Sequence, residues 1–414
     1  MNNPPSTSPR QQARPAERWL ALGLSIFAFA LFFWSTKATQ QPFDYTARIA
    51  GALLQGKVGL TSKPPSWLNE MVPMNGEFYS VFPLGAVLTM LPVAVLQNMN
   101  LLHHFPAHFI ASLTAAGCVF FFFRLSAVGP GSLVRRAMLA LFPVFGTWTW
   151  CNVAFGGAWQ LALGFALVGE TAALYYTVAK PQPLIAGACY GLACGNRTEL
   201  TLIAPLFVYL WIRRSDTPPG WRQWWPALIA QRRALALFLV APVALGLATV
   251  AYNFARFGSP LDFGYARIPG VLNEPWYHGR LFSFTAIPWN MYKMLFAGVE
   301  DIPDFPYIRP FPFGCSIFLS SPFLFLLFRE GGKVRGVCWL AIGILTFVLW
   351  CHGNPGGWQF SYRYGMILLP WMFLLILGNG PAKLSVTELA LFLVSVAVNV
   401  VAMYQFIWTD QIHP

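Results

Sequence analysis

The sequence predicts an all-α polytopic membrane protein, and three observations lead to this prediction. Of its 414 residues, 56% are hydrophobic and only 10% are charged, whereas soluble domains carry about 25% charged residues. The mean hydropathy is +0.53. Several apolar segments approach the about 20 residues that a helix needs to cross a bilayer. Soluble enzymes and DNA-binding modules are therefore excluded. A disulfide scaffold is excluded as well, because most of the seven cysteines lie in apolar segments.

The apolar segments predict about eleven transmembrane helices in one membrane domain, residues 19–414. Residues 1–18 are rich in Pro, Ser and Gln and predict a disordered cytoplasmic tail. A cleaved signal peptide is the alternative for the first segment, but Trp19 and Trp34 at its ends favour a membrane span. The expected spans are 19–35, 105–123, 137–152, 159–179, 183–196, 199–212, 234–252, 313–328, 336–350, 365–380 and 385–407.

Two further apolar stretches, 84–97 and 281–297, are interrupted by Pro92 and Pro288. As a helix, the first would reach only about 21 Å, which is short of the about 30 Å hydrocarbon core. We expect both to be interfacial helices that lie along the membrane surface. They then belong to two large extracytoplasmic loops, 36–104 and 253–312.

The basic residues set the predicted orientation. With that assignment, sixteen of the 27 Lys and Arg residues fall in short cytoplasmic segments, which places the N-terminus inside and the C-terminus outside. The net charge of +12 therefore reports topology and does not indicate a nucleic-acid partner. These sixteen residues are Arg10, Arg14, Arg18, Arg124, Arg135, Arg136, Lys180, Arg213, Arg214, Arg222, Arg232, Arg233, Arg329, Lys333, Arg335 and Lys383.

The first outer loop opens with a candidate catalytic residue. Asp44 is its first carboxylate and precedes a helical-looking stretch, residues 45–55. A carboxylate close to the membrane surface can serve as a general base. The alternative is a structural role, because Asp is favoured at the N-cap of a helix.

Farther along the loop, Asn75-Gly76 indicates a turn. The residues that follow it predict a wall for a lipid or a sugar, with polar contacts from Glu77, Tyr79 and Ser80. A turn before an apolar helix explains the same pattern.

Several segments together resemble the C-type (GT-C) superfamily of integral-membrane glycosyltransferases. They are Asp44 followed by NGEFYSVFPLGAVLTMLP, then GLACGNRTELTLIAPL, YNFARFGSPLDFGY and WQFSYRYGMILLP, in this order along the chain. The chain most resembles the bacterial branch related to protein O-mannosyltransferases and to the lipid A aminoarabinose transferases (glycosyltransferase family 39-like). The resemblance implies a GT-C-like fold, a polyprenyl-phosphate sugar as donor, and Asp44 as the catalytic carboxylate. Many members carry Asp-Glu at that place, whereas this chain has Asp44-Tyr45.

A phosphate leaving group needs cationic partners, and Arg serves best because its guanidinium binds two oxygens at once. The outward-facing candidates for the donor phosphate are Arg363, Arg197 and Arg256, and Arg48 is a candidate for substrate binding. The alternative for Arg363 and Arg256 is a side chain that reaches to lipid headgroups. Arg197 has a further alternative, an ion pair with Glu199.

For the other charged residues and the histidines, a structural role explains the sequence better than a functional one. Glu300, Asp301 and Asp304 form an acidic cluster that would suit a divalent cation, but a solvated loop explains it better. His103, His104 and His108 resemble a metal set only superficially, because Pro106 breaks the helix that would align them. No metal ligand or certain cofactor is assigned. Glu170, in the middle of a span, is expected to be neutral and hydrogen-bonded.

The expected function is transfer of a sugar from a polyprenyl-phosphate donor to a hydroxyl of an envelope acceptor, with Asp44 as general base. The acceptor would be a lipid-linked molecule or a glycan, and the reaction would take place at the outer face of the plasma (inner) membrane. The resemblance implies inversion at the sugar. Two alternatives stay open, a transporter or flippase of polyprenyl-linked glycans and a glycan polymerase or ligase. Transporters often show internal repeats, and this sequence shows none.

Overall fold

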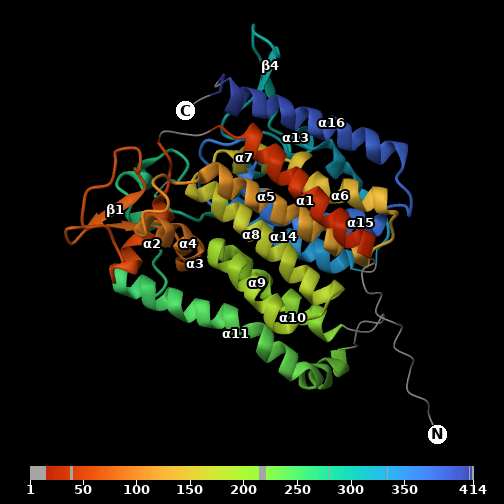
Figure 1. Cartoon of the computed structure of the whole chain (residues 1–414), viewed down its shortest axis with the longest axis horizontal. Coiled ribbons are helices and arrows are strands. Elements are labelled where there is room, and N and C mark those ends of the chain that lie inside the picture. Colours follow the sequence, from red (N-terminus) through yellow and green to blue (C-terminus); the bar gives the residue numbers. More distant parts are fainter. Residues whose placement is uncertain are drawn as a thin grey trace.

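The computed structural model describes residues 15–37, 41–213, 221–277, 279–332, 334–409 and 411–412. The described chain is mostly helical, as in an all-α membrane protein. A bundle of long helices takes up most of it, and a smaller lobe of short helices and a hairpin lies at one end (Figure 1). Of the predicted tail, residues 1–14 with Arg10 and Arg14 lie outside the described residues, as do Arg214 and Lys333. Residues 15–18 already belong to the first helix.

The bundle elements follow the predicted apolar segments closely. They are α1 (Pro15–Ser35), α5 (Ala107–Leu125) with η1 (Ser126–Val128), α6 (Leu133–Phe145), α7 (Thr149–Ala154), α8 (Ala158–Leu174) with η2 (Tyr175–Ala179), α9 (Pro183–Asn196), η3 (Thr198–Ile203) with α10 (Ala204–Ile212), η4 (Trp221–Gln223) with α11 (Trp224–Phe257), α13 (Ile317–Ser320) with η8 (Pro322–Phe328), α14 (Arg335–Cys351), η9 (Arg363–Leu368) with α15 (Leu369–Asn379), and α16 (Val386–Met403) with η10 (Tyr404–Trp408).

The described residues contain five helical segments that are long and apolar enough to cross a membrane: 15–35, 107–128, 158–179, 224–257 and 386–408. Three shorter apolar helical segments, 198–212, 335–351 and 363–379, accompany them. Every predicted span is helical, but the count of eleven stays a prediction. The segment expected at 234–252 is in fact the 34-residue helix α11.

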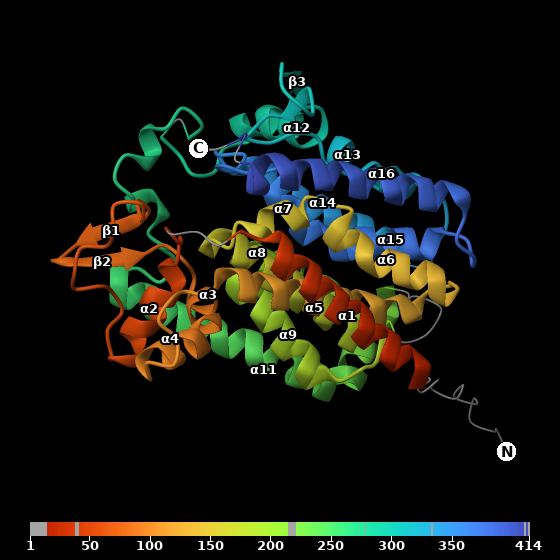
Figure 2. The ribbon, with the colours of Figure 1, turned by 45° about the horizontal axis from the view of Figure 1, so that its top comes forward.

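The two predicted outer loops supply the remaining elements, and the first of them builds most of the end lobe (Figures 1 and 2). The first supplies α2 (Tyr45–Leu54), the strands β1 (Met71–Met74) and β2 (Glu77–Ser80), α3 (Leu84–Thr89) and α4 (Leu91–Asn98). The second supplies η5 (Tyr265–Arg267), η6 (Val271–Asn273), η7 (Phe284–Ala286), α12 (Ile287–Leu295), β3 (Val299–Asp301) and β4 (Ile308–Pro310). In Figures 1 and 2, α2, α3, α4 and the β1–β2 hairpin lie together beside one end of α11.

Local sequence explains the elements of the lobe. The helix predicted over 45–55 is α2. Strands β1 and β2 pair antiparallel, with Met71 opposite Ser80 and Met74 opposite Glu77. Their turn is Asn75-Gly76, as predicted, with φ of 52° and 80°, which suits these residue types. The prediction of one continuous helix over 84–97 is wrong. The segment forms two helices, α3 and α4, which are separated at Met90, and Pro92 lies in the first turn of α4.

Contacts between distant segments define two ends of the bundle. At the end predicted to be cytoplasmic, Arg136 pairs with Glu17 at 3.4 Å and the Arg124 guanidinium donates to the Tyr175 hydroxyl at 2.8 Å. At the opposite end, Trp408 Nε1 donates to the Ser35 carbonyl at 2.8 Å. Segments that were predicted to share a side therefore contact one another.

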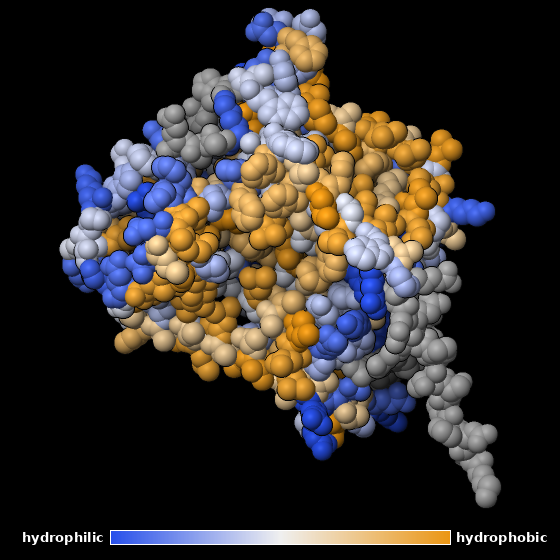
Figure 3. Space-filling model, viewed as in Figure 1, coloured by the Kyte–Doolittle hydropathy of each residue, from blue (hydrophilic) through white to orange (hydrophobic). Residues whose placement is uncertain are grey.

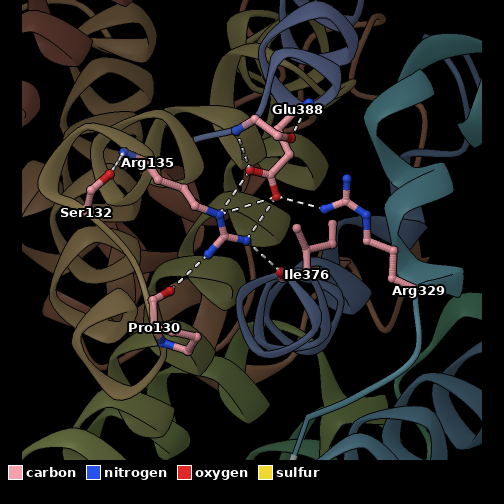
Figure 4. Close-up of polar contacts among 7 residues, drawn as sticks. Pro130, Ser132, Arg135, Arg329, Ile376 and Glu388 are labelled. Atoms are coloured by element: carbon pink, nitrogen blue, oxygen red, sulfur yellow. Dashed lines mark hydrogen bonds and ion pairs between the residues drawn. The ribbon is translucent and has the colours of Figure 1, made fainter. Parts of the chain in front are cut away.

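A buried ionic cluster ties four elements together at the first of these ends (Figure 4). Arg135 of α6 and Glu388 of α16 are both fully buried, and their closest ion-pair distance is 3.1 Å. Arg329, which follows η8, pairs with the same carboxylate at 2.9 Å. Arg135 also donates to the carbonyls of Pro130 and Ile376, each at 3.0 Å. A buried guanidinium is stable only with such partners, so Arg135 has a structural role.

Hydropathy is unevenly distributed over the surface. In the face that Figure 3 shows, apolar side chains extend across the middle, whereas polar ones gather over the β1–β2 hairpin and around β3–β4. Large apolar side chains are exposed on α1 and α11, among them Ile26, Phe27 and Leu247. An exposed apolar middle between polar ends is the surface that a membrane protein presents to lipid.

Candidate functional site

Asp44 occupies the N-cap position of α2, but its side chain does not cap the helix. Instead, Asp44 Oδ1 accepts a hydrogen bond from Arg48 Nε at 2.7 Å, one helical turn away. The Asp44 side chain is nearly buried, whereas Arg48 is partly exposed. The structure therefore brings these two candidate residues together and gives Asp44 Oδ1 a cationic partner.

Arg363 begins η9 directly after the loop 352–362. The residue is 7% exposed. Its Nε has no hydrogen-bond partner, and no carboxylate lies within ion-pair distance of it in the described part of the chain. The guanidinium makes a long hydrogen bond, from Nη1 to the Trp358 carbonyl at 3.4 Å, and its carbon lies over the Tyr364 ring, 5.2 Å from the centroid. A buried guanidinium with spare N–H groups is costly unless a ligand completes it.

The loop that carries Arg363 is tightly held. The Gln359 side chain donates to the Pro355 carbonyl at 3.0 Å and accepts from the Arg363 backbone N–H at 3.0 Å. Ser361 has a φ of 56°, an uncommon conformation for a residue other than glycine. Its hydroxyl donates to the Cys315 carbonyl at 3.1 Å. These contacts fix the Arg363 backbone before any ligand binds.

A cavity of about 680 Å³ opens beside this loop. Residues 194–202, the outer half of α11 and the segment 260–266 form most of its wall, and the end of α14 contributes to it. Much of this wall is apolar, including Leu202, Leu245, Val250, Leu261 and Phe282. Its polar and aromatic lining comes from Trp159, Asn196, Arg197, Glu199, Asn253, Asp262, Tyr265, His352 and Tyr364. The cavity is thus mostly apolar and has polar and aromatic side chains in its wall.

Arg197 lies in the cavity wall and forms an ion pair with Glu199. This pairing is one of the interpretations that the sequence left open for Arg197. Its Nε and Nη2 both reach Glu199 Oε1, at 2.8 and 2.5 Å. The guanidinium also lies over the ring of Tyr364, with its carbon 4.9 Å from the centroid. Arg197 therefore brings a largely neutralised positive charge to the pocket, in contrast to Arg363.

Arg256 holds the lobe to α11, although its Nε is buried and has no hydrogen-bond partner. Its guanidinium donates to the Ser80 carbonyl and, at 2.6 Å, to Asn253 Oδ1. It also stacks over Tyr252, 3.8 Å from the ring centroid. The contacts of Arg256 with Ser80, Asn253 and Tyr252 are structural. A role of Arg256 at a phosphate stays a prediction.

The other candidate residues of the first outer loop lie in strand β2. The Ser80 side chain accepts from the Phe82 N–H at 3.2 Å and is fully buried. The Tyr79 ring packs edge-on against Phe257 at 5.8 Å. Within the described residues, neither Glu77, Tyr79 nor Ser80 lines the cavity.

The sequence offers Glu70, like Glu77, as a second carboxylate beside Asp44, but it does not show that either folds back to the site. Its carboxylate Oε2 accepts a hydrogen bond from Trp159 Nε1, in the cavity wall. Burial raises the pKa of Glu70 above its ordinary value, while the Trp159 hydrogen bond and the charge of Arg363 lower it and the charge of Glu274 raises it. Glu70 and Arg363 are thus close enough to interact. The sequence signal for Glu70 was weak: a carboxylate between the apolar residues Leu68 and Met71.

Aromatic contacts connect Asp44 to the cavity. Tyr45 directly follows Asp44, and its hydroxyl accepts from the Glu70 backbone N–H at 3.4 Å. The ring of Tyr45 packs on Phe82, which packs on Trp159 with centroids 4.0 Å apart. Trp159 in turn meets Tyr265 edge-on at 5.9 Å. Asp44, Glu70 and the polar pocket therefore belong to one connected region.

Comparison with known proteins finds no family model that matches the chain, no similar curated protein and no similar solved structure.

Among the described residues, no group of three or more His, Cys, Asp and Glu side chains is arranged to hold a metal ion. Glu300 of the predicted acidic cluster pairs with Arg309 at 2.6 Å, across the β3–β4 hairpin. His108 packs edge-on against Phe33 at 5.0 Å. The hydrogen bond expected for Glu170 is confirmed, since its Oε1 accepts from Trp371 Nε1 at 2.6 Å.

Proposed function

We propose that this protein transfers a sugar from a polyprenyl-phosphate donor to a hydroxyl of an envelope acceptor at the outer face of the membrane. One observation carries the proposal: Arg363 is buried without a carboxylate partner among the described residues, and it directly precedes Tyr364, which lines a largely apolar cavity that also has polar and aromatic side chains in its wall. A molecule with a hydrocarbon chain, a phosphate and a sugar has the three chemical parts that this arrangement accommodates. The resemblance to the GT-C superfamily points to the same donor.

Each part of the site has a role in the proposed reaction. The apolar wall between α11 and α14 holds the first part of the lipid chain, and Arg363 binds the donor phosphate with charge-assisted hydrogen bonds. The acceptor oxygen attacks C1 of the sugar and gives its proton to Asp44. The bond between C1 and the phosphate oxygen breaks, and the polyprenyl phosphate leaves with the electron pair. Arg363 stabilises the charge that develops on this leaving group.

Asp44 has the partners that such a base needs. Oδ1 is held by Arg48, whereas Oδ2 accepts no hydrogen bond in the described structure and is free to take a proton. Arg48 therefore orients the carboxylate. Inversion at C1 is what the resemblance implies for a single displacement of this kind.

The first test compares envelope glycolipids and glycans of native cells that carry the wild-type protein, Asp44→Asn or no protein, by mass spectrometry. Asn keeps the size of the side chain and removes the base, so we expect it to lower transfer by about 10²–10⁴-fold. Both altered strains should lack the same sugar unit. Asp301→Asn, on the exposed β3–β4 hairpin, is the matched control and should retain this unit.

The other outcomes separate the competing functions. If the null strain lacks the unit and Asp44→Asn retains it, Asp44 is not the base. If the null strain instead accumulates a longer lipid-linked glycan at the wrong face of the membrane, the protein is a transporter. Loss of long polymer with every single unit retained identifies a polymerase or ligase.

A further inference from the structure

A second carboxylate lies at the site, and no motif of the sequence assigns it a role. The loop between α2 and β1 folds back onto the start of α2: Trp67 Nε1 donates to the Pro42 carbonyl at 3.2 Å, and Leu68 is buried. This fold places Glu70 against Trp159, a residue that lines the cavity. Glu70 is thus brought to the pocket from a loop remote in sequence from Arg363.

The two oxygens of the Glu70 carboxylate differ. Oε2 accepts from Trp159 Nε1. Oε1 accepts no hydrogen bond from the described residues and is not a buried, unpartnered atom, so it is open to a ligand. A carboxylate oxygen is an acceptor only, and the donors that a sugar offers are its hydroxyl groups.

Glu70 and Arg363 form a complementary pair without forming an ion pair. Each responds to the charge of the other, yet no ion pair within 4.0 Å joins them in the described structure. A ligand with an anionic group at one end and hydroxyl donors at the other would complement an arginine that has no carboxylate partner and a carboxylate that accepts one hydrogen bond. A sugar phosphate is such a ligand.

Aromatic side chains complete this end of the pocket. Trp159 and Tyr265 meet edge-on in the cavity wall, and the Tyr277 hydroxyl donates to the Tyr265 hydroxyl at 3.1 Å. Rings of this kind pack against the C–H faces of a sugar while a neighbouring carboxylate binds its hydroxyls. The hydrogen bond from Trp159 fixes Glu70 relative to the Trp159 ring.

We infer that Glu70 is a substrate-binding residue that accepts a hydrogen bond from a sugar hydroxyl of the donor, with Trp159 as its positioning residue and Arg363 on the phosphate. This inference rests on the proposed function and deepens it. Asp44 keeps the role of base toward the acceptor, while Glu70 determines how well the site distinguishes a sugar-bearing lipid phosphate from the bare one.

The experiment measures binding of two kinds of probe to the full-length protein in lipid nanodiscs. One probe is a ten-carbon prenyl phosphate, and the others are the same phosphate carrying glucose, mannose, galactose or arabinose. We expect the wild type to bind at least one sugar-bearing probe about tenfold or more tightly than the bare phosphate, as a hydrogen bond to a charged group predicts. Glu70→Gln should abolish this difference and leave the affinity for the bare phosphate within about twofold.

Control variants separate the roles of the residues. Arg363→Gln should weaken binding of both kinds of probe. Trp159→Phe keeps a ring and removes the N–H that holds Glu70, so it should reduce the sugar-dependent difference only in part. Glu70→Asp, one methylene shorter, gives a second test if Glu70→Gln does not fold. Glu300→Gln, a carboxylate of the other outer loop, should bind as the wild type does.

The contrary outcomes are distinct. If the wild type binds none of the probes, the proposed function fails and this inference fails with it. If the wild type prefers a sugar-bearing probe and Glu70→Gln shows the same preference, only the role of Glu70 is overturned. If the wild type binds the bare phosphate and every sugar form equally, Glu70 does not bind a sugar of this class.

Discussion

At Glu70, one carboxyl group combines partial burial with a single strong hydrogen bond from Trp159. Burial is the largest influence on it and raises its pKa, with Arg363 and Glu274 as the charged groups that face it. Within the same region, burial also raises the pKa values of Tyr45 and Tyr265, which keeps both phenols neutral. In this region, charge is therefore carried by carboxylates and arginines and not by these two phenols.

This raised pKa predicts how stability depends on pH. Between the ordinary Glu pKa of about 4.3 and its higher value in the fold, the folded protein binds more protons than the unfolded one. The contribution of Glu70 to the free energy of unfolding therefore falls as the pH rises through that window. Relative to Glu70→Gln, the wild type should lose thermal stability as the pH rises above about 4.3.

Thermal unfolding of both proteins in the same detergent, at a series of pH values, measures this difference. Glu300→Gln, on the exposed hairpin, should show a pH dependence close to that of the wild type. A Tm difference between wild type and Glu70→Gln that does not change with pH would contradict the raised pKa.

Residues of the site differ in how far sequence could predict them. Asp44, Arg197 and Arg363 stand out because each is an ionisable residue at the boundary of an apolar segment. The pairing of Arg197 with Glu199 was one of two alternatives. Glu70 was not predicted to act, because its proximity to Arg363 depends on the path of the loop 55–70, and that path is fixed by contacts such as Trp67 with Pro42.

Among the elements, α9 and α11 pack with almost no space between their backbones. A Cβ built on Gly187 would lie 2.0 Å from the Phe238 carbonyl oxygen, whereas one built on Gly191 would meet Ala241 at an ordinary 3.5 Å. Gly187 therefore allows the close approach of α11, whose outer half forms the cavity wall. Gly191 lies one turn farther along on the same face.

This difference predicts opposite effects of the same substitution. Gly187→Ala must separate the two backbones and should destabilise the protein by about 1–3 kcal/mol. Gly191→Ala meets no obstacle and should be neutral or stabilise it by up to about 1 kcal/mol, because Ala favours helix over Gly. Unfolding in mixed detergent measures both. Equal effects of the two substitutions would be inconsistent with this packing.

Hydropathy predicts where helices lie better than where they break. All expected apolar segments are helical, including those at 84–97 and 281–297. The break between α6 and α7 was not predicted, because Gly146 lies within a continuous apolar run. The early start of α11 was missed because Trp224, Trp225 and the two arginines 232 and 233 lower its hydropathy without ending its helix.

For the whole molecule, the described contacts separate two ends, and the charge distribution predicts which side of the membrane each end faces. The β1–β2 lobe and the cavity share one end, while Arg136, Arg329 and Glu388 share the other. Which end faces the cytoplasm is a prediction from the basic residues. The surface in Figure 3 is compatible with a membrane between the ends and does not orient it.

Labelling of single introduced cysteines in intact cells tests this orientation. Lys63→Cys, on the exposed loop before β1, should react with a membrane-impermeant maleimide from outside. Arg233→Cys, on α11, should react only after the membrane is permeabilised. The seven native cysteines are buried except for the half-buried Cys189, and the unsubstituted protein is the control. The reverse pattern would place the cavity on the cytoplasmic side.

The ionic cluster of Figure 4 also has a consequence for biosynthesis. Arg135 and Glu388 are 253 residues apart in sequence, so the ribosome delivers the arginine long before its carboxylate. Until α16 enters the membrane, α6 carries an uncompensated charge at the position where the finished protein buries it. The carboxylate of α16, the last long helix to be made, thus neutralises the arginine of α6. In a truncated chain that lacks α16, Arg135 has no Glu388 partner, and we expect cellular proteases to degrade such a chain.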